Sequence, residues 1–397
     1  MTELCFDLAV IGGGVNGCGI ARDDVGRGAS VLLLEAGDLA SGTSSASTKL
    51  IHGGLRYLEH YEFALVREAL GERERLWAMA PHLIHPLRFV LPHAPGLRPR
   101  WMLRVGLFLY DHIGGRRHLP PTESLDLRNH PAGEALKPAF RRGFAYSDCQ
   151  VDDSRLVVMN ARDAADRGAQ VITRCPVTGL AREAGHWRIE TPSGTFQARA
   201  VVNAAGPSVL ALLGLSHEET GRQIRLVRGT HIVVPRLCEH GFAYFFQLRD
   251  GRIVFAIPWE EHFTLIGTTD RDHHEGSFDV RATDEEIAYL CEGVNGYFRR
   301  QISPAEVIWA FAGVRPLVDE GDGKPEAATR GYKLELSPKQ EGPPILTVFG
   351  GKITTYRHLA ENAVELLSQR LPEIAGKSWT GRSSLPGGDF AAAEGDS

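Results

Sequence analysis

The sequence contains no long apolar run and no pattern of a secretory signal. A helix that spans a bilayer needs about 20 predominantly apolar residues in succession, so we expect no membrane-spanning segment. The N-terminus leads straight into a strand pattern, without the basic and apolar regions of a signal peptide. Secretion is therefore not expected, whereas attachment to a membrane surface is left open.

Cysteine spacing and net charge exclude two further classes. The six cysteines are scattered along the chain, without a Cys-x-x-Cys pair or a neighbouring group of histidines. This pattern is typical of reduced thiols in the cytoplasm and predicts no metal site. A net charge of −5 predicts no basic face for nucleic acid. With 397 residues and 43% hydrophobic content, the chain is typical of a globular protein with two domains.

The first 35 residues carry the pattern of a dinucleotide-binding unit. A short apolar run at 6–11 is typical of a buried strand, and a Gly-x-Gly-x-x-Gly motif follows it directly. The glycines of the motif are Gly12, Gly14 and Gly17. A helical pattern at 18–28 and a second apolar run at 31–34 then lead to Glu35. The glycines let the backbone approach a pyrophosphate at a helix N-terminus, and an acidic residue at this spacing can accept hydrogen bonds from a ribose.

Later segments favour FAD as the dinucleotide. Residues 41–49 are rich in hydroxyl groups that can surround the ribityl and phosphate groups of FAD, and a solvated loop is the alternative. A strand pattern leads into small residues at 203–207, and another leads into a glycine pair at 350–351 before a helix. N–H donors at that helix start can stabilise a reduced flavin. No second Gly-x-Gly-x-x-Gly follows a strand, which favours an organic substrate as the hydride donor.

Two signatures and several shorter blocks resemble the FAD-dependent (aerobic-type) glycerol-3-phosphate dehydrogenase family. Residues 11–28 look like the N-terminal signature of that family, and residues 350–360 look like its C-terminal signature. Similar blocks lie between them, at 49–61, 146–153, 229–235, 267–270 and 313–317. The resemblance covers residues 5–387. Family members usually continue after a Leu-Pro-Gly-Gly segment into a helical C-terminal domain, whereas this sequence stops at Ser397.

The resemblance implies an α/β fold with a discontinuous Rossmann-like FAD-binding domain and a substrate domain on a mixed or antiparallel sheet. We assign residues 1–90, 145–225 and 340–375 to the first, 91–144 and 226–339 to the second, and 376–397 to the stub of a missing domain. It also implies non-covalent FAD, oxidation of sn-glycerol 3-phosphate to dihydroxyacetone phosphate by hydride transfer to flavin N5, and quinone as the electron acceptor.

Two other functions remain open at this point. One is an oxygen-using amine or amino-acid oxidase on the same scaffold, and the other is a non-catalytic, truncated flavin-binding fragment. A homodimer and a peripheral location on the cytoplasmic side of the inner membrane are also left open. Residues 97–110 mix basic with large apolar side chains. Such a helix can lie on an anionic membrane surface, and an ordinary core-facing helix is the alternative.

A phosphate ester requires cationic partners, and the planar fork of arginine suits its oxygens. Arg56 lies just past the hydroxyl-rich loop, whereas Arg315 lies in an apolar segment, where it is either paired in the interior or faces a pocket. Arg330 is a third candidate. Tyr57 can donate a hydrogen bond to the phosphate, and Lys352 can hold either the phosphate or the pyrimidine edge of the flavin.

Oxidation of a secondary alcohol requires a base for the hydroxyl proton, and histidine titrates in the right range. His231 lies in a strand pattern at 230–235, and His52 precedes a glycine pair. Either can be the base, and a hydrogen-bonded structural histidine is the alternative for each; Lys352 is a further catalytic candidate. The residues that we assign to FAD are Gly12, Gly14, Gly17, Glu35, Thr43, Ser44, Ser45, Ser47, Lys49, Val177, Gly206, Gly351, Lys352 and Thr354.

Overall fold

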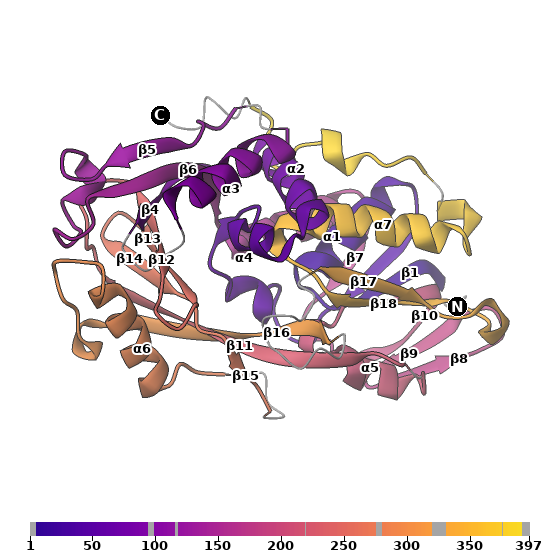
Figure 1. Ribbon diagram of the computed structural model, residues 1–397. Coiled ribbons are helices and arrows are strands. Elements are labelled where there is room, and N and C mark those ends of the chain that lie inside the picture. Colours follow the sequence, from indigo (N-terminus) through magenta and orange to yellow (C-terminus); the bar gives the residue numbers. More distant parts are fainter. Residues whose placement is uncertain are drawn as a thin grey trace.

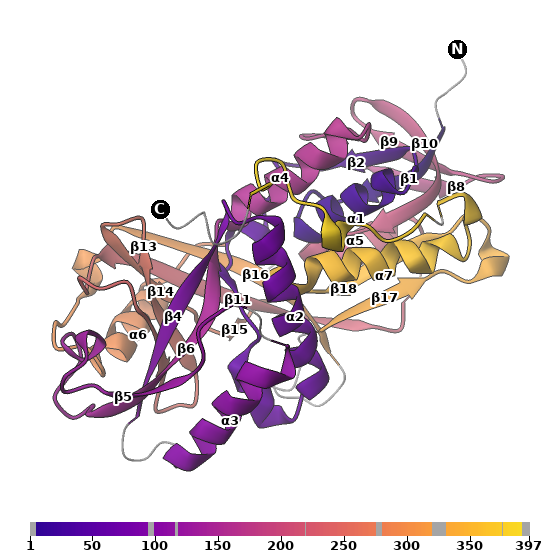
Figure 2. The ribbon, with the colours of Figure 1, turned by 90° about the horizontal axis from the view of Figure 1, so that it is seen from above.

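The structure is a computed structural model that describes residues 5–93, 99–115, 118–218, 220–274, 280–319, 331–374 and 376–390. Two β-sheets, each with its own covering helices, lie side by side and give the molecule an elongated shape (Figure 1). We call the sheet that contains the N-terminal strand the first sheet, and the other one the second sheet. The view turned by 90° shows helices lying against both sheets (Figure 2).

The first sheet has a parallel centre. Its strands run in the order β17 (Tyr332–Leu336), β18 (Ile345–Gly350), β10 (Gly194–Asn203), β1 (Cys5–Ile11), β2 (Val31–Leu34) and β7 (Gln170–Ile172), and β8 (Gly179–Arg182) and β9 (Trp187–Thr191) extend it beside β10. Strand β1 is parallel to both of its neighbours, whereas β17 is antiparallel to β18. All four residues of β2 are buried, as expected for a parallel strand that is covered on both faces.

Helices cover both faces of the first sheet. On one face, α1 (Val15–Gly26), α4 (Asp153–Asp166) and α7 (Tyr356–Ser368) pack on alternate strand residues such as Leu8 and Val10. On the other face, α5 (Val209–Leu215) and the β8–β9 hairpin pack on Ala9 and Ile11. The alternation of buried residues between the faces follows from the two-residue period of a strand.

The second sheet is mixed, and most of its pairs are antiparallel. Its main order is β15 (Arg271–Asp272), β11 (Gln223–Pro235), β14 (Phe263–Gly267), β13 (Ile253–Trp259), β12 (Ala243–Gln247), β4 (Ile84–His93), β6 (Arg142–Val151) and β3 (Leu50–Ile51). Strand β16 (Trp309–Asp319) pairs with β11, and β5 (Glu123–Asp126) pairs with β6. Helices α2 (Phe63–Met79) and α3 (Arg100–Ile113) cover one face, and α6 (Asp284–Asn295) covers the other.

Strands β11 and β16 join the two halves of the molecule. They pair over eleven residues, from Gln223–Asp319 to Val233–Trp309. Ile224 and Val318, at the far end of this ladder, pack into the hydrophobic cluster of the first sheet, whereas Val233 belongs to a cluster of the second sheet. Figure 1 shows this long ribbon running beneath both halves.

The predicted α/β class with a dinucleotide-binding half and a mixed-sheet half is confirmed. The predicted strands at 6–11 and 31–34 are confirmed as β1 and β2. The division between the two sheets differs from the predicted domain borders. Strands β3 and β4 belong to the second sheet, although residues 1–90 are assigned from the sequence to the FAD-binding domain. Strand β17 belongs to the first sheet, although residues 226–339 are assigned from the sequence to the substrate domain. Within the described ranges, no helix has the length and hydropathy needed to cross a membrane.

Candidate active site

The glycine turn after β1 can form only without side chains. Gly12 has φ +117°, and a Cβ there would lie 2.4 Å from the carbonyl oxygen of Ala204, just past β10. A Cβ on Gly17 would lie 1.9 Å from the carbonyl oxygen of Gly12. The turn therefore packs closely against Ala204 and against its own backbone, and it leads directly into the N-terminus of α1, the arrangement in which proteins bind a pyrophosphate.

Glu35 anchors this turn through its carboxylate. One carboxylate oxygen accepts a hydrogen bond from the amide of Gly13 at 2.5 Å, and the other accepts one from Gly37 at 2.7 Å. The predicted ribose contact of Glu35 stays a prediction. The observed bonds place the acidic side chain at the same edge of the first sheet as the glycine turn.

The two sequence signatures meet in space. The Asn16 side-chain amide donates to the carbonyl oxygen of Gly350 at 3.2 Å, and a Cβ on Gly351 would lie 2.8 Å from the same amide nitrogen. Gly350 and Gly351 have φ values of +73° and +104°, which other residues rarely adopt. Just beyond them, the Thr354 hydroxyl accepts a hydrogen bond from the amide of His52 at 3.2 Å.

The hydroxyl-rich loop lies between the two sheets and is tied to both. Thr43 donates to the carbonyl oxygen of Val314 on β16 at 2.5 Å, and Ser44 accepts from the amide of Val15 on α1 at 3.0 Å. A Cβ on Gly313 would come within 2.6 Å of the Ala46 methyl group. The loop therefore passes close over the β11–β16 ribbon, and the glycine allows this approach.

Asp153, at the start of α4, holds the far end of the same loop. Its carboxylate accepts from the Ser47 hydroxyl at 2.7 Å and from the Lys49 ammonium at 2.7 Å. Ser45 donates to the carbonyl oxygen of Gly42. The FAD contacts predicted for Ser45, Ser47 and Lys49 stay predictions, and the observed bonds show that these side chains shape the loop itself.

His231 is buried on β11, which pairs with β14 and β16 in the second sheet. It lies opposite Gly267 on β14, which lies opposite Phe255 on β13. A Cβ on Gly267 would lie 2.0 Å from the His231 ring, so the ring leans over this glycine. The ring also stacks on Phe311, with 5.0 Å between centroids.

The chemistry of His231 follows from this burial. Desolvation, with the charges of Arg315 and Lys49, lowers the pKa of His231 to about 3. The imidazole is therefore neutral at pH 7. Its Nε2 lies 3.0 Å from the Thr48 hydroxyl, whereas Nδ1 has no hydrogen-bond partner among the described residues. With its proton on Nε2, the neutral ring would carry its free lone pair on Nδ1, while the lowered pKa opposes protonation of the ring.

The second candidate base, His52, reaches the same face of the sheet. Its ring meets Phe255 edge to face, with 6.3 Å between centroids. Phe255 and His231 flank Gly267 in one row across three antiparallel strands, so their side chains share a face. The structure thus brings both histidines to one side of the second sheet.

Arg315 also lies on this face. On β16 it is four residues after Phe311, the ring that stacks on His231. A Cβ on Gly229, two residues before His231 on β11, would lie 3.0 Å from its guanidinium, so the side chain extends across that glycine. The guanidinium donates to the carbonyl oxygen of Thr269 and pairs with Asp270. With its side chain 33% exposed, Arg315 keeps N–H groups for a ligand.

Lys352 and Tyr57 connect the C-terminal signature with the candidate phosphate residues. The Lys352 ammonium lies 3.8 Å from the centroid of the Tyr57 ring. Tyr57 and Arg56 lie on a short 3₁₀ helix, η2 (Leu55–His60), which directly follows the glycine pair after His52. Arg330 lies outside the described residues.

The last two candidates for FAD lie at the first sheet. Val177 is partly buried against the cluster beneath β2 and β10. Gly206 has φ +57° and opens a short 3₁₀ helix after β10. Their contacts with FAD stay predictions.

Sequence reasoning missed Thr48 and Asp153, which hold site segments in place, and Asp148, whose buried carboxylate accepts hydrogen bonds from Tyr110 and Arg73. Asp148 and Asp153 belong to the block at 146–153 that resembles the family, but the block gave no role for either. The sequence alone does not distinguish a buried, paired carboxylate from one at the surface. Thr48 lies inside the predicted hydroxyl-rich loop, where only the register of the strands opposite identifies its partner.

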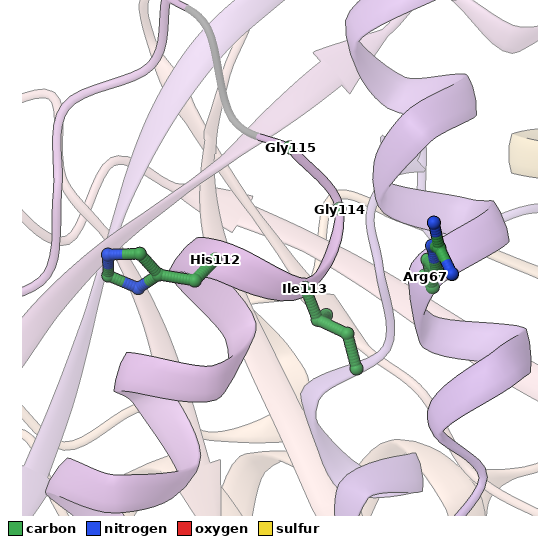
Figure 3. Close-up of a pocket in the computed structure, with 5 residues that line it drawn as sticks. All are labelled: Arg67, His112, Ile113, Gly114 and Gly115. Atoms are coloured by element: carbon green, nitrogen blue, oxygen red, sulfur yellow. The ribbon is translucent and has the colours of Figure 1, made fainter.

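A cavity of about 410 Å³ lies apart from these residues. It opens between α2 and the C-terminal end of α3 (Figure 3). Its lining consists of Arg67, His112, Ile113, Gly114 and Gly115. None of the described candidate residues lines it, so it is not the site that holds the histidines.

Comparison with known proteins agrees with this geometry. The profile of the family described as "FAD dependent oxidoreductase" matches residues 7–357. D-erythritol 1-phosphate dehydrogenase of Brucella abortus is 50% identical over 399 residues, covering 99% of this chain and 79% of that protein. Glycerol-3-phosphate dehydrogenase of Pseudomonas aeruginosa is 52% identical over 390 residues, covering 97% of this chain and 75% of that protein.

A solved structure shares the fold over nearly the whole chain. It is the glycerol-3-phosphate dehydrogenase from Bacillus halodurans complexed with FAD, at 29% identity and a TM-score of 0.77. The match covers 99% of this chain and 70% of that one.

Proposed function

The chain belongs to the FAD-dependent oxidoreductase family, and on this basis we propose that it oxidises the secondary alcohol of glycerol 3-phosphate. The observation that carries the proposal is that a candidate base, His231, and a cation, Arg315, lie on the same face of the second sheet. His231 is neutral and has an Nδ1 without a hydrogen-bond partner in the described part of the chain. The Arg315 guanidinium extends over Gly229, two residues before His231 on β11, where a Cβ would lie 3.0 Å from it.

The residues present fit FAD. The glycine turn leads directly into the N-terminus of α1, and the buried Asn16 Oδ1 on the first turn of that helix has no hydrogen-bond partner within the described ranges. The turn at Gly12–Gly17 would hold the pyrophosphate, and the segment from Gly351 to Thr354 would lie at the flavin. When bound, FAD supplies the hydride acceptor.

The side chains of the protein supply binding and proton transfer. Arg315 would bind the substrate phosphate, with Lys352 and Arg56 adding positive charge. This anchor would place the secondary hydroxyl at His231, whose Nδ1 takes the hydroxyl proton as the hydride leaves carbon. Thr48 fixes the ring through Nε2 at 3.0 Å, so the accepting nitrogen keeps its direction during the reaction.

Two relatives of nearly equal identity bear different substrate names, which makes D-erythritol 1-phosphate a second candidate. Both substrates are phosphate esters of polyols and require the same cation and the same base. They differ in chain length. Values of kcat/KM for the two compounds, measured with the same enzyme, decide between them, and we expect glycerol 3-phosphate to give the higher value.

Electrons would leave the flavin to a quinone dissolved in a membrane, and helix α3 supports this part of the proposal. Trp101, Val105 and Phe108 are 67%, 51% and 59% exposed. Their spacing of four and three residues places them on one side of the helix. Leu107 and Tyr110, on the opposite side, are buried. Helix α3 is therefore both core-facing and exposed, and its outer side can enter the headgroup layer of a bilayer.

The experiment that tests the proposed function is reduction of the bound flavin by substrate without oxygen. Glycerol 3-phosphate should reduce it, whereas amino acids should not. Reduction by an amino acid alone would favour the oxidase alternative, and reduction by no compound would favour the non-catalytic alternative.

A further inference from the structure

We propose that Tyr110 is a positioning residue that sets the backbone of the segment 53–57, from which Arg56 and Tyr57 extend toward the substrate. What this segment binds rests on the proposed function. The placement itself rests on a buried network that joins α3, α2 and β6 to the loop after β3.

The network has three fully buried members. The Tyr110 hydroxyl accepts a hydrogen bond from the amide of Gly53 at 2.8 Å and donates to the Asp148 carboxylate at 2.8 Å. The Arg73 guanidinium donates to the same carboxylate at 2.7 Å. Tyr110, Asp148 and Arg73 are exposed by only 2%, 2% and 3%, so water does not replace these bonds.

The direction of each bond in the network is fixed. Burial and the charge of Asp148 raise the pKa of Tyr110 well above its usual value, so the phenol keeps its proton. Burial raises the pKa of Asp148 and the Arg73 guanidinium opposes this shift; with Arg73 paired to it at 2.7 Å, the carboxylate accepts from the phenol. The hydroxyl oxygen accepts from the Gly53 amide, and the same amide also interacts with the Asp148 carboxylate.

The loop is shaped for this contact. A Cβ on Gly53 would lie 2.5 Å from the Leu70 side chain and 2.9 Å from the Tyr110 ring. Gly53 therefore lets the ring approach the backbone. At the next residue, Gly54, φ is +73° and a Cβ would lie 2.1 Å from the Tyr57 ring. The turn folds Tyr57 back over the glycine pair, where its ring meets the Lys352 ammonium at 3.8 Å.

The loss of the Tyr110 hydroxyl should therefore act on substrate binding through the loop. Tyr110→Phe removes the phenol oxygen that accepts from the Gly53 amide, while the ring still fills its place. We expect KM for glycerol 3-phosphate to rise about tenfold, with kcat changed by less than about threefold. FAD content should equal that of the wild type.

Tyr244→Phe is the matched control. Tyr244 is also buried, at 1% exposure, and its hydroxyl donates to the carbonyl oxygen of Ala132 at 2.7 Å. It packs in the cluster on the α6 face of the second sheet, away from the segment 53–57. Tyr244→Phe also removes one buried phenol oxygen and should lower stability to a similar extent, but KM for glycerol 3-phosphate should stay at the wild-type value.

The test measures steady-state kinetics and backbone amide exchange on the FAD-loaded enzymes. We expect faster exchange in the segment 53–57 of Tyr110→Phe, together with the higher KM, and neither change in Tyr244→Phe. Unchanged KM and exchange in Tyr110→Phe would overturn the proposal, as would equal changes in both variants. If the wild type oxidises no polyol phosphate, the proposed function fails, and the exchange result still decides whether Tyr110 positions the loop.

Discussion

The Nε2 atom of His231 lies 3.0 Å from the hydroxyl oxygen of Thr48, although 183 residues separate the two in sequence. The contact joins the hydroxyl-rich loop to β11 of the second sheet. The other ring nitrogen, Nδ1, has no hydrogen-bond partner among the described residues.

His231→Asn should lower kcat by about a hundredfold to ten-thousandfold, the range that a positioned base supplies. FAD content should stay the same, because the side chain lies on the second sheet and not at the glycine turn. His52→Asn provides the comparison, and we expect a smaller loss of kcat. Measurement of kcat for both variants decides the assignment, and a larger loss in His52→Asn would make His52 the base.

Arg315→Ala should lower kcat/KM for glycerol 3-phosphate by about tenfold to a few hundredfold, because a charge-assisted hydrogen bond to phosphate is lost. Arg315→Lys should restore only part of this, since an ammonium cannot reproduce the planar fork. Glycerol, which lacks the phosphate, should lose little in either variant. Equal losses for glycerol and glycerol 3-phosphate would mean that Arg315 does not bind the phosphate.

Arg222→Ala is a suitable control for that experiment. Arg222 forms an ion pair with Glu335 at 2.8 Å, outside the row of site residues. Its removal should leave kcat/KM for both compounds unchanged.

Asp24→Asn should stabilise the protein above neutral pH. Asp24 is fully buried on α1, and neither carboxylate oxygen has a hydrogen-bond partner in the described part of the chain. Burial, with the charge of Asp23, raises the pKa of Asp24 to about 8. Between its unfolded pKa and this value the folded state binds the extra proton, so the wild type loses stability as pH rises through that window.

The asparagine side chain does not titrate, so its advantage should be small near pH 4 and grow to about 1–3 kcal/mol near pH 8. Urea unfolding midpoints of both proteins at the two pH values measure this difference. The same difference at both pH values would contradict the raised pKa.

Trp101→Ser combined with Phe108→Ser should weaken binding to vesicles that contain anionic lipid, because both side chains are exposed on the outer side of α3. Activity with a soluble dye as acceptor should not change. The control is Leu210→Ser combined with Ile308→Ser, which removes exposed apolar side chains elsewhere. Co-sedimentation with vesicles measures binding, and equal binding of both double variants would contradict a role for α3.

The sequence was sufficient for the elements that carry strong local patterns. The glycines at 12–17 and the apolar runs on either side of them can adopt few other structures, and β1, α1 and β2 follow the prediction. The glycine pair at 350–351 was equally informative, because both residues adopt positive φ. Local pattern and global fold agree at these positions.

Other features depend on contacts between distant segments and could not be predicted. Glu35 satisfies two backbone amides, and Ser47 and Lys49 bind Asp153. The partner of a polar side chain is set by strand register and loop packing, which a local pattern does not contain. For the same reason, the lowered pKa of His231 became visible only when its burial was known.

Anaerobic titration of the FAD-loaded protein with glycerol 3-phosphate is the direct test of the proposed oxidation. We expect the absorbance band of oxidised flavin to disappear as substrate is added, and dihydroxyacetone phosphate to form in proportion. Glycine and other amino acids should leave the band unchanged under the same conditions. If the band persists with saturating glycerol 3-phosphate, or if only an amino acid removes it, the protein does not oxidise glycerol 3-phosphate through its flavin.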